Sequence, residues 1–320
     1  MNIIFMGTPE FAVPSLNIIL SSHHQVSAVV TAPDKPQGRG LKPAESAVKR
    51  TALSHDLNIL QPDDLHDKSF SDKIQELSPD LIVIVAFRIL PREVFTIPKF
   101  GSINLHASLL PKYRGAAPIN WALINGEKET GVTTFFLKER VDTGNIIMAE
   151  KCSISDDDDA GTLHDKLALL GANTLMSTLN LLEMTNGNVP VYEQSEALYT
   201  RAPKIFKEFC KINWDNSART LYNFIRGLSP YPTAFTHHNG KILKIFRTLC
   251  SSKDMGSTLI HLAPGTVEIR DGKMHVICND GFIEILEIQL EGKKRMSVSE
   301  FIRGYKIQHG DMLTHDLSGS

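Results

Sequence analysis

Residues 80–86 read Asp-Leu-Ile-Val-Ile-Val-Ala, and this apolar, branched run is the clearest signal of a buried strand in the chain. Two similar runs precede it, Asn-Ile-Ile-Phe-Met-Gly at 2–7 and a β-branched run at 26–31. Helical patterns separate these runs, at about 9–20, 44–55 and 69–77. Strands that alternate with helices form parallel sheets with right-handed crossovers, so we expect a doubly wound, mostly parallel α/β sheet.

The alternation continues beyond residue 100. Four further elements are expected, namely strands at 101–106 and 132–137 and helices at about 117–125 and 162–184. Short strands near 146–150 and 152–154 are expected to pair with each other. Residues 33–43 are basic and rich in proline and glycine, which predicts a loop.

The pattern changes after residue 212. One helix is expected at about 217–226, followed by short strands at 234–237, 241–248, 265–270, 273–278 and 281–290. Asn239-Gly240 and Asp271-Gly272 are typical of hairpin turns. Antiparallel strands at this spacing predict a small β-barrel, of the kind found in oligonucleotide-binding domains.

A chain of 320 residues exceeds one typical domain. We divide it into a Rossmann-like catalytic domain at 1–189, a proline-flanked linker at 190–205, a barrel domain at 206–310 and a tail at 311–320. The acidic run at 156–159 is interpreted as a solvated loop.

Positive charge gathers in the last third of the chain. Residues 201–310 contain 17 Lys and Arg against 10 Asp and Glu, a balance of +7, although the whole chain has a net charge of −2. A basic region on an acidic body favours a polyanionic partner for that region. Ordinary solvated surface charge is the alternative interpretation.

The four cysteines stand far apart and form no paired spacing, which argues against a zinc knuckle or a disulfide framework. The sequence shows no leader peptide, and its longest apolar run is too short to span a membrane. These observations predict a soluble, cytoplasmic protein, and a monomer is the default expectation.

The turn after the first strand, Gly7-Thr8-Pro9, raises the possibility of a dinucleotide site. It lacks the G-x-G-x-x-G pattern, and Pro9 stiffens the turn where a pyrophosphate would need a close backbone. A nicotinamide-dependent dehydrogenase is therefore disfavoured.

Three polar residues near the carboxyl ends of the strands form the candidate catalytic centre. Asn104 and His106 are two positions apart at the end of a predicted strand, so both point to one face. Asp142 follows the next strand and can return towards His106. Attack of an amine on an acyl-type carbon needs a base for the amine proton, a donor to the developing oxyanion and a group that holds the imidazole, which suit His106, Asn104 and Asp142 in that order. No nucleophile elbow or reactive cysteine is apparent, which favours direct transfer.

Several motifs resemble those of the methionyl-tRNA formyltransferases. These are Met-Gly-Thr-Pro-Glu-Phe-Ala at 6–12, the run from Asn104 to Pro118, and Asp-Thr-Gly at 142–144. Asn-x-His followed by Ser-Leu-Leu-Pro is similar to the whole formyltransferase superfamily, which includes enzymes that formylate sugars. The basic loop at 34–40, the segment at 199–204 and the C-terminal motifs at 263–267 and 292–296 narrow the resemblance to the tRNA enzymes.

The resemblance implies a folate-dependent enzyme that moves the formyl group of 10-formyltetrahydrofolate to the α-amino group of methionine on initiator methionyl-tRNA, without a metal. It implies that the folate-binding residues are Phe87, Arg88, Ile89, Leu90, Ser108, Leu109, Leu110, Pro111 and Val141. It further implies that the tRNA-binding residues are Arg39, Lys42, Lys293, Lys294 and Arg295. The sequence departs from the commoner pattern at 138–140, Lys-Glu-Arg, where many members have an acidic residue and then glycine.

Three other interpretations remain at this stage. A sugar-nucleotide formyltransferase would use the same three residues, although the basic loop and the basic barrel argue against it. A non-catalytic RNA-binding protein would explain the barrel but not Asn104, His106 and Asp142. Purely structural roles for those three residues are the remaining alternative.

Overall fold

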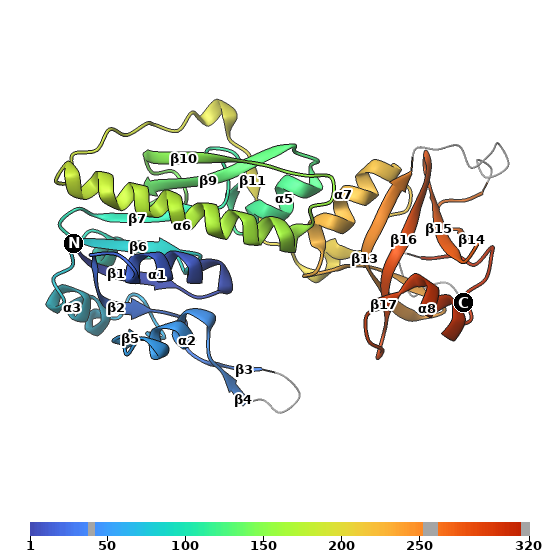
Figure 1. The fold of residues 1–320 in the computed structure, drawn as a ribbon, viewed down its shortest axis with the longest axis horizontal. Helices are drawn as coiled ribbons and strands as arrows, with labels where there is room; N and C mark the ends of the chain where they lie inside the picture. Colours follow the sequence, from blue (N-terminus) through green and yellow to red (C-terminus); the bar gives the residue numbers. More distant parts are fainter. Residues whose placement is uncertain (38–41, 252–261, 315–320) are drawn as a thin grey trace. The chain divides into compact units, whose positions relative to one another are not determined.

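The computed structural model describes residues 1–37, 42–251 and 262–314 (Figure 1). Its contacts divide the chain into two units. The first unit comprises residues 1–118, 129–153 and 164–203, and the second comprises residues 119–128, 154–163 and the described residues from 204 onward. No helix in these described ranges has both the length and the apolar character needed to cross a membrane.

The first unit is built on a seven-stranded sheet in the order β10-β9-β7-β6-β1-β2-β5 (Figure 1). Its strands are β1 (Asn2–Gly7), β2 (Gln25–Val30), β5 (Ile59–Leu60), β6 (Leu81–Val85), β7 (Ser102–His106), β9 (Glu129–Phe136) and β10 (Ile146–Ser153). The pairs from β5 to β7 are parallel, whereas β9 and β10 add antiparallel strands at one edge. The predicted doubly wound, mostly parallel α/β sheet is confirmed.

Helices lie between the strands of this sheet along the chain, and the last helix, α6, follows its final strand. They are α1 (Val13–Leu20), α2 (Ala47–Ser54), α3 (Lys68–Glu76), α4 (Arg92–Phe95), α5 (Pro118–Ile124) and α6 (Ala160–Met184). All five residues of β6 are buried, because the sheet is covered on both faces. Chain order runs from β1 outward to β2 and β5, then returns to β6 on the other side of β1. This reversal leaves a crevice at the carboxyl ends of the strands, where open α/β folds bind ligands.

Three local predictions for this unit differ from the structure. The helix expected at about 9–20 begins as a 3-10 turn at Glu10–Ala12, with Pro9 at its N-cap and no hydrogen bond from a capping side chain. Residues 146–153 form one continuous strand because nothing in the sequence turns the chain at Lys151. The basic loop contains a short antiparallel pair, β3 (Lys35–Gln37) and β4 (Lys42–Ala44). A two-stranded ribbon consists of edge strands only, and edge strands tolerate proline.

The segment expected to be a linker, 190–205, pairs with the first unit up to residue 203. A bridge joins Tyr192 to Ile146, and β11 (Arg201–Ala202) pairs in parallel with β8 (Arg114–Gly115). The carbonyl groups of this segment accept hydrogen bonds from amides of the loop that follows β7. One of these bonds runs from Arg114 N to Thr200 O at 3.0 Å.

The second unit contains an antiparallel sheet in the order β12-β13-β16-β15-β14, with β17 paired to β16. Its strands are β12 (Ala234–His238), β13 (Lys241–Ser251), β14 (Val267–Arg270), β15 (Lys273–Cys278), β16 (Gly281–Leu290) and β17 (Met296–Ser297), and its helices from residue 204 on are α7 (Ala218–Leu228) and α8 (Val298–Gly304). Both residues of Asn239-Gly240 and of Asp271-Gly272 have positive φ, as hairpin turns of this type require. The sequence analysis did not predict α8. This helix begins with a capping box between Ser297 and Glu300.

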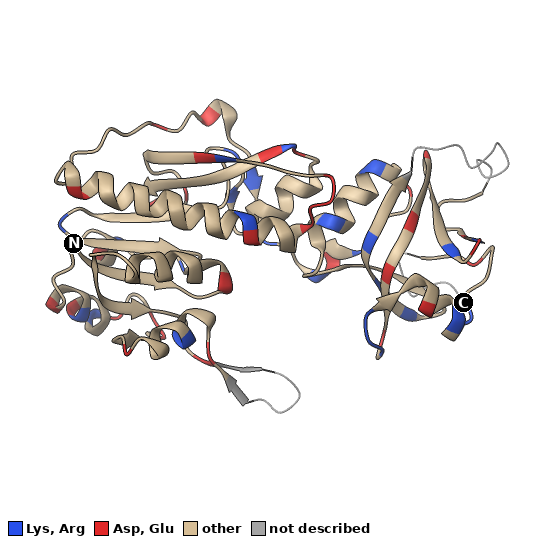
Figure 2. Ribbon diagram, in the orientation of Figure 1, with Lys and Arg blue, Asp and Glu red and all other residues tan. Residues whose placement is uncertain are grey.

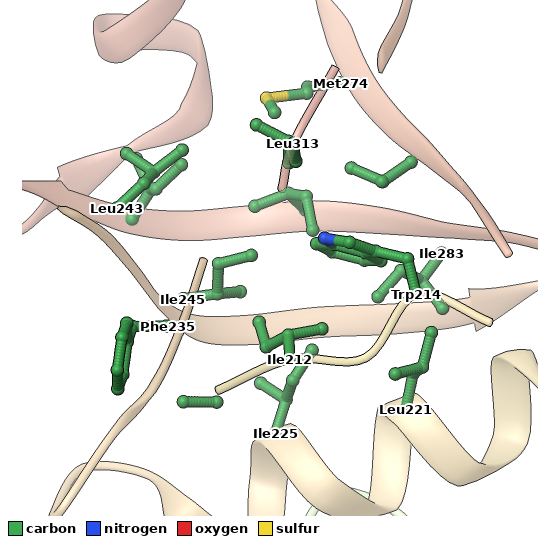
Figure 3. Packing of buried hydrophobic residues seen from close by; sticks show 14 of the residues in the cluster. Ile212, Trp214, Leu221, Ile225, Phe235, Leu243, Ile245, Met274, Ile283 and Leu313 are labelled. Atoms are coloured by element: carbon green, nitrogen blue, oxygen red, sulfur yellow. The ribbon is translucent and has the colours of Figure 1, made fainter. Parts of the chain in front are cut away.

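Residues of the expected tail close this sheet into a barrel. Thr314 bridges to His237 in β12, and Met312 bridges to Thr266 just before β14. The segment therefore lies between the two edge strands of the sheet, and residues 311–314 belong to the barrel. Leu313 is 2% exposed and lies in the hydrophobic core beside Met274 and Trp214 (Figure 3).

We expect Leu313→Ala to lower the free energy of unfolding by about 2–5 kcal/mol, because it removes a fully buried aliphatic side chain. Met312→Ala is the matched control, since Met312 is 43% exposed and should cost much less. Chemical denaturation followed by tryptophan fluorescence measures both variants. Equal stability of the two variants would show that this segment does not hold the barrel closed.

Two short segments between strands of the first unit cluster with the second unit, although we had assigned them to the catalytic domain. Asn120 Nδ2 donates to the carbonyl of Gly227 at 2.7 Å. The guanidinium of Arg226 donates to the carbonyl of Ser155 at 2.9 Å, and the phenol of Tyr222 donates to that of Asp156. The acidic run is therefore anchored by its backbone and is not simply a solvated loop; Asp158 is 4% exposed.

Candidate active site

Asn104 and His106 lie at the carboxyl end of β7, next to β6 and β9. Asn104 is paired with Ile84 and Phe135, and His106 is opposite Thr133. The two residues occupy alternate positions of one strand, so they share a face as predicted. That face opens at the crevice edge of the sheet.

The imidazole of His106 is buried and held by the backbone. Its Nε2 lies 2.8 Å from the carbonyl oxygen of Tyr113. A carbonyl only accepts hydrogen bonds, so Nε2 carries a proton and, in the neutral ring, Nδ1 has the free lone pair. Nδ1 faces Asp142, with 3.9 Å between Nδ1 and Oδ2. This separation is too long for a direct hydrogen bond, and it suits a bridging water or a substrate proton.

The loop that supplies the Tyr113 carbonyl is fixed by side chains. The Ser108 hydroxyl donates to the Lys112 carbonyl at 2.6 Å, and the Thr133 hydroxyl donates to the Ser108 carbonyl at 2.7 Å. Tyr113 itself has a φ of +60°, which turns its carbonyl towards the imidazole side of the loop. The orientation of His106 therefore depends on this loop more than on Asp142.

Asp142 is positioned by two distant segments. Its Oδ2 accepts from the amide of Gly115 at 2.9 Å. Gly115 has a φ of +128°, and a Cβ there would stand 2.5 Å from the carbonyl oxygen of Ala202, so only glycine fits. Gln194 Nε2 donates to the carbonyl oxygens of Asp142 at 2.9 Å and of Gly144 at 2.7 Å.

The sequence did not indicate Gln194, because nothing in its neighbourhood marks it as part of a site. We expect Gln194→Ala to lower turnover by about 10-fold, since the loop that bears Asp142 loses both bonds to that amide. Steady-state kinetics measure this effect, with Gln75→Ala as the control, because Gln75 is exposed on α3 and lines neither cavity of the site. A variant with unchanged turnover would remove Gln194 from the support of the site.

A cavity of about 550 Å³ opens beside these residues. Its lining residues are Ile84, Phe87, Arg88, Ile89, Leu90, Asn104, Phe135, Leu137, Lys138, Glu139, Val141 and Asp142. Five of the predicted folate residues are therefore in its wall, together with two of the three predicted catalytic residues. The mixture of aromatic, aliphatic and a few polar groups is typical of a small-molecule pocket.

Two details of this cavity concern residues named in the sequence analysis. Its lining does not include Ser108, Leu109, Leu110 or Pro111, because that loop folds inward to hold His106. The unusual Lys138-Glu139 pair is in the wall, where Glu139 is 2.7 Å from Arg92 and Lys138 bonds Asn145 at 2.8 Å.

A second cavity, of about 510 Å³, shares Val141 and Asp142 with the first. Its other lining residues are Arg114, Gly115, Arg140, Thr143, Tyr199, Arg201 and Pro203. Asp142 is thus common to a largely apolar cavity and a cationic one. This arrangement can bring two substrates together, one in each cavity.

The predicted tRNA-binding residues belong to two regions. Arg39 lies outside the described residues, and the side chain of Lys42 in β4 is also outside what the structure describes. Lys293, Lys294 and Arg295 are exposed in the turn between β16 and β17. Arg295 stacks over Phe246 at 4.4 Å and pairs with Glu287. Figure 2 shows Lys and Arg on several elements of the second unit, with Asp and Glu among them.

Within the described ranges, one group has the atoms of a metal ligand set, His23, His24 and Glu183. Its members already bond each other, with 2.6 Å between His23 Nε2 and Glu183 Oε2. Burial lowers the pKa of His24, and the bond from His23 lowers the pKa of Glu183. The cluster is accounted for as an ion pair on the surface, and none of its members lines either cavity described above.

Comparison with known proteins identifies relatives along the whole chain. Residues 1–179 match the model of the formyl transferase family, and residues 204–306 match that of the formyl transferase C-terminal domain. A methionyl-tRNA formyltransferase of Acetivibrio thermocellus is 45% identical over 317 residues, covering 98% of this chain and 99% of that protein. A methionyl-tRNA formyltransferase of Chlorobium luteolum is 46% identical over 309 residues, covering 96% of this chain and 97% of that protein.

Solved structures share the fold at lower identity. HypX from Aquifex aeolicus, in complex with tetrahydrofolic acid, matches with a TM-score of 0.65 and 17% identity, over 98% of this chain and 50% of that one. An N-formyltransferase of Helicobacter canadensis, in complex with folinic acid and dTDP-3-aminofucose, matches with a TM-score of 0.66 and 21% identity. The match covers 92% of this chain and 99% of that one. At these identities the likeness concerns the fold alone.

Proposed function

This chain belongs to the formyl transferase family, and from that membership we propose how it works: it formylates the methionine of initiator methionyl-tRNA, with 10-formyltetrahydrofolate as the donor. Relatives that are 45% identical over nearly their full length bear the name of this activity. The single observation that carries the mechanism is that Asn104 and Asp142 line one cavity and that the imidazole of His106 lies behind Asp142, with 3.9 Å between His106 Nδ1 and Asp142 Oδ2.

The first cavity fits a folate-type donor. Phe87, Ile89 and Leu90 give it an apolar wall for a flat ring, and such a wall with a few polar groups is typical of small-molecule sites. Arg88 is held by the carbonyls of Pro62 and Asp63, at 2.6 and 2.9 Å, which keeps this wall in place. When bound, 10-formyltetrahydrofolate supplies a formyl group activated for transfer to an amine.

The residues of the chain have complementary roles in the transfer. The amide of Asn104 donates a hydrogen bond to the formyl oxygen as that oxygen gains negative charge. Nδ1 of His106 takes the proton of the attacking amine, because Nε2 already donates to the Tyr113 carbonyl. The imidazole then gives this proton to N10 of the departing tetrahydrofolate as the bond between N10 and the formyl carbon breaks. The Asp142 carboxylate, held by the Gly115 amide, stabilises the positive charge on the imidazole.

The remaining sequence assignments are part of the same proposal. Arg39 and Lys42 in the basic segment, and Lys293, Lys294 and Arg295 in the turn between β16 and β17, contact tRNA phosphates. This contribution weakens with salt. The catalytic part extends to about residue 203, because the segment at 190–203 pairs with the first unit and supplies Gln194 to the site, and the tRNA-binding barrel follows it. No metal takes part, and the enzyme acts as a monomer in the cytoplasm.

A formyl-transfer assay tests the proposal. The enzyme is incubated with 10-formyltetrahydrofolate and either methionyl initiator tRNA or an amino-sugar nucleotide. Product from the charged tRNA alone supports the proposal. Product from the amino-sugar nucleotide alone would support formyl transfer but show that the acceptor is a sugar. No product with either acceptor would refute both the reaction and the acceptor.

A further inference from the structure

The second cavity contains a buried cationic group without a complete set of partners. The Arg114 side chain is 4% exposed, and its Nη2 has no hydrogen-bond partner among the described residues. A buried guanidinium N–H without an acceptor costs free energy comparable to a lost charged hydrogen bond. Such a group at the wall of a cavity indicates an anionic ligand.

The rest of the Arg114 guanidinium is rigidly held. Nε donates to Gln194 Oε1 at 2.9 Å, Nη1 donates to Glu196 Oε1 at 2.8 Å, and the group lies 4.9 Å from the centroid of the Tyr199 ring. Because two of its three nitrogens are bonded, Nη2 has a defined direction. An anion that accepts from it meets a preorganised donor and needs little reordering.

The charge of the cavity favours an anion as well. Arg114, Arg140 and Arg201 are in its wall, with Asp142 as the acidic member. Glu196 pairs with Arg114 and lies 3.9 Å from Arg140, and the bond from Arg114 lowers the pKa of Glu196, so that carboxylate stays charged. Arg201 Nε donates to the Tyr199 hydroxyl at 3.0 Å, a partner that is not a carboxylate. Three cations in the wall against the carboxylates of Asp142 and Glu196 leave an excess of positive charge.

We propose that this cavity binds the phosphodiester of the 3′-terminal nucleotide of the acceptor, beside the reacting amine. The proposal rests on the function proposed above. In a charged tRNA the carboxyl group of the amino acid is esterified, so the phosphate of the last nucleotide is the nearest anion to the amine. The two cavities share Val141 and Asp142, which places an anion in the second one next to the catalytic centre. Arg114 and Arg201 bind the phosphate, and Tyr199 offers a ring for the terminal base.

The test compares adenosine 5′-monophosphate with adenosine as inhibitors of the formylation of methionyl initiator tRNA. The enzymes are the wild type, Arg140→Gln, Arg201→Gln and the control Arg50→Gln, whose exposed arginine pairs with Glu10 at 2.7 Å. Both cavity arginines are exposed at the surface, so these variants avoid the risk that a change at buried Arg114 would unfold the protein. Thermal unfolding checks that all four enzymes are folded.

We expect the monophosphate to inhibit the wild type and the control about 10-fold to 100-fold more strongly than adenosine, which corresponds to one or two charged hydrogen bonds. In Arg201→Gln the ratio should fall up to about 10-fold, because Arg114 remains as a donor, and in Arg140→Gln it should fall less, because only the charge of the wall is reduced. In both variants the KM for tRNA should rise while kcat changes little. Equal inhibition of the wild type by both compounds, or an unchanged ratio in both variants, would overturn the proposal. If the wild type did not formylate charged tRNA at all, the proposed function itself would fail, which distinguishes the two failures.

Discussion

His106→Ala is expected to lower the turnover of formyl transfer by about 10²- to 10⁴-fold, the usual effect of losing a general base. Nδ1 is the ring nitrogen with the free lone pair, and it faces Asp142 across 3.9 Å, where the amine proton can be received. Without the imidazole the attacking amine keeps its proton and the addition step becomes slow. Single-turnover kinetics with charged tRNA measure the loss.

His106→Gln separates this chemical role from a structural one. The glutamine amide can still donate to the Tyr113 carbonyl, which His106 Nε2 holds at 2.8 Å, but it offers no base. Both variants should be folded by circular dichroism and equally slow. Recovery of turnover in the glutamine variant would mean that His106 only holds the loop, and that the base is another group.

Asn104→Ala is expected to lower turnover by about 10²- to 10³-fold, because a preorganised donor to a developing oxyanion typically contributes this much. Asn104 is half-buried and lines the folate cavity, so its amide can meet the formyl oxygen there. The affinity for the folate should change far less than kcat, since the bond strengthens only as charge develops. Isothermal titration with a non-reactive folate measures the affinity, and steady-state kinetics measure kcat.

Asn104→Asp is the matched variant, because it keeps the shape of the side chain and replaces the amide donor with a carboxylate. Turnover at least as low as that of the alanine variant is expected, since a carboxylate cannot donate and repels the oxyanion. If Asn104→Asp worked as well as the wild type, stabilisation of the formyl oxygen by Asn104 would be refuted.

Much of the architecture follows from local patterns in the sequence. The buried runs at 2–7 and 80–86 became β1 and β6, and the two hairpin turns of the barrel have the positive φ angles that their Asn-Gly and Asp-Gly pairs predict. Such features depend on side-chain periodicity and on backbone freedom within a few residues. The alternation of Asn104 and His106 along one strand is of the same kind.

The structure departs from the sequence-based predictions where a segment contacts residues that are far away in the chain. The barrel is closed by residues 311–314, which read as a tail, because backbone pairing with Thr266 and His237 leaves no mark in the side chains. The loop at 108–111, which the resemblance places among the folate-binding residues, is held next to His106 by the Thr133 hydroxyl, and the sequence did not indicate this contact. Segments 119–128 and 154–163 joined the barrel unit for a similar reason.

By itself, the sequence determined the parallel sheet, the barrel, and the three polar residues that face one crevice, because period, turn residues and residue chemistry are local properties. Only the tertiary structure decided which nitrogen of His106 is free, how Gly115 and Gln194 hold Asp142, and that Arg114 is buried with one nitrogen unpaired. These features depend on backbone carbonyls, amides and side chains brought together from separate segments. Any residue type presents the same backbone groups, so the one-dimensional chain contains no signal for them.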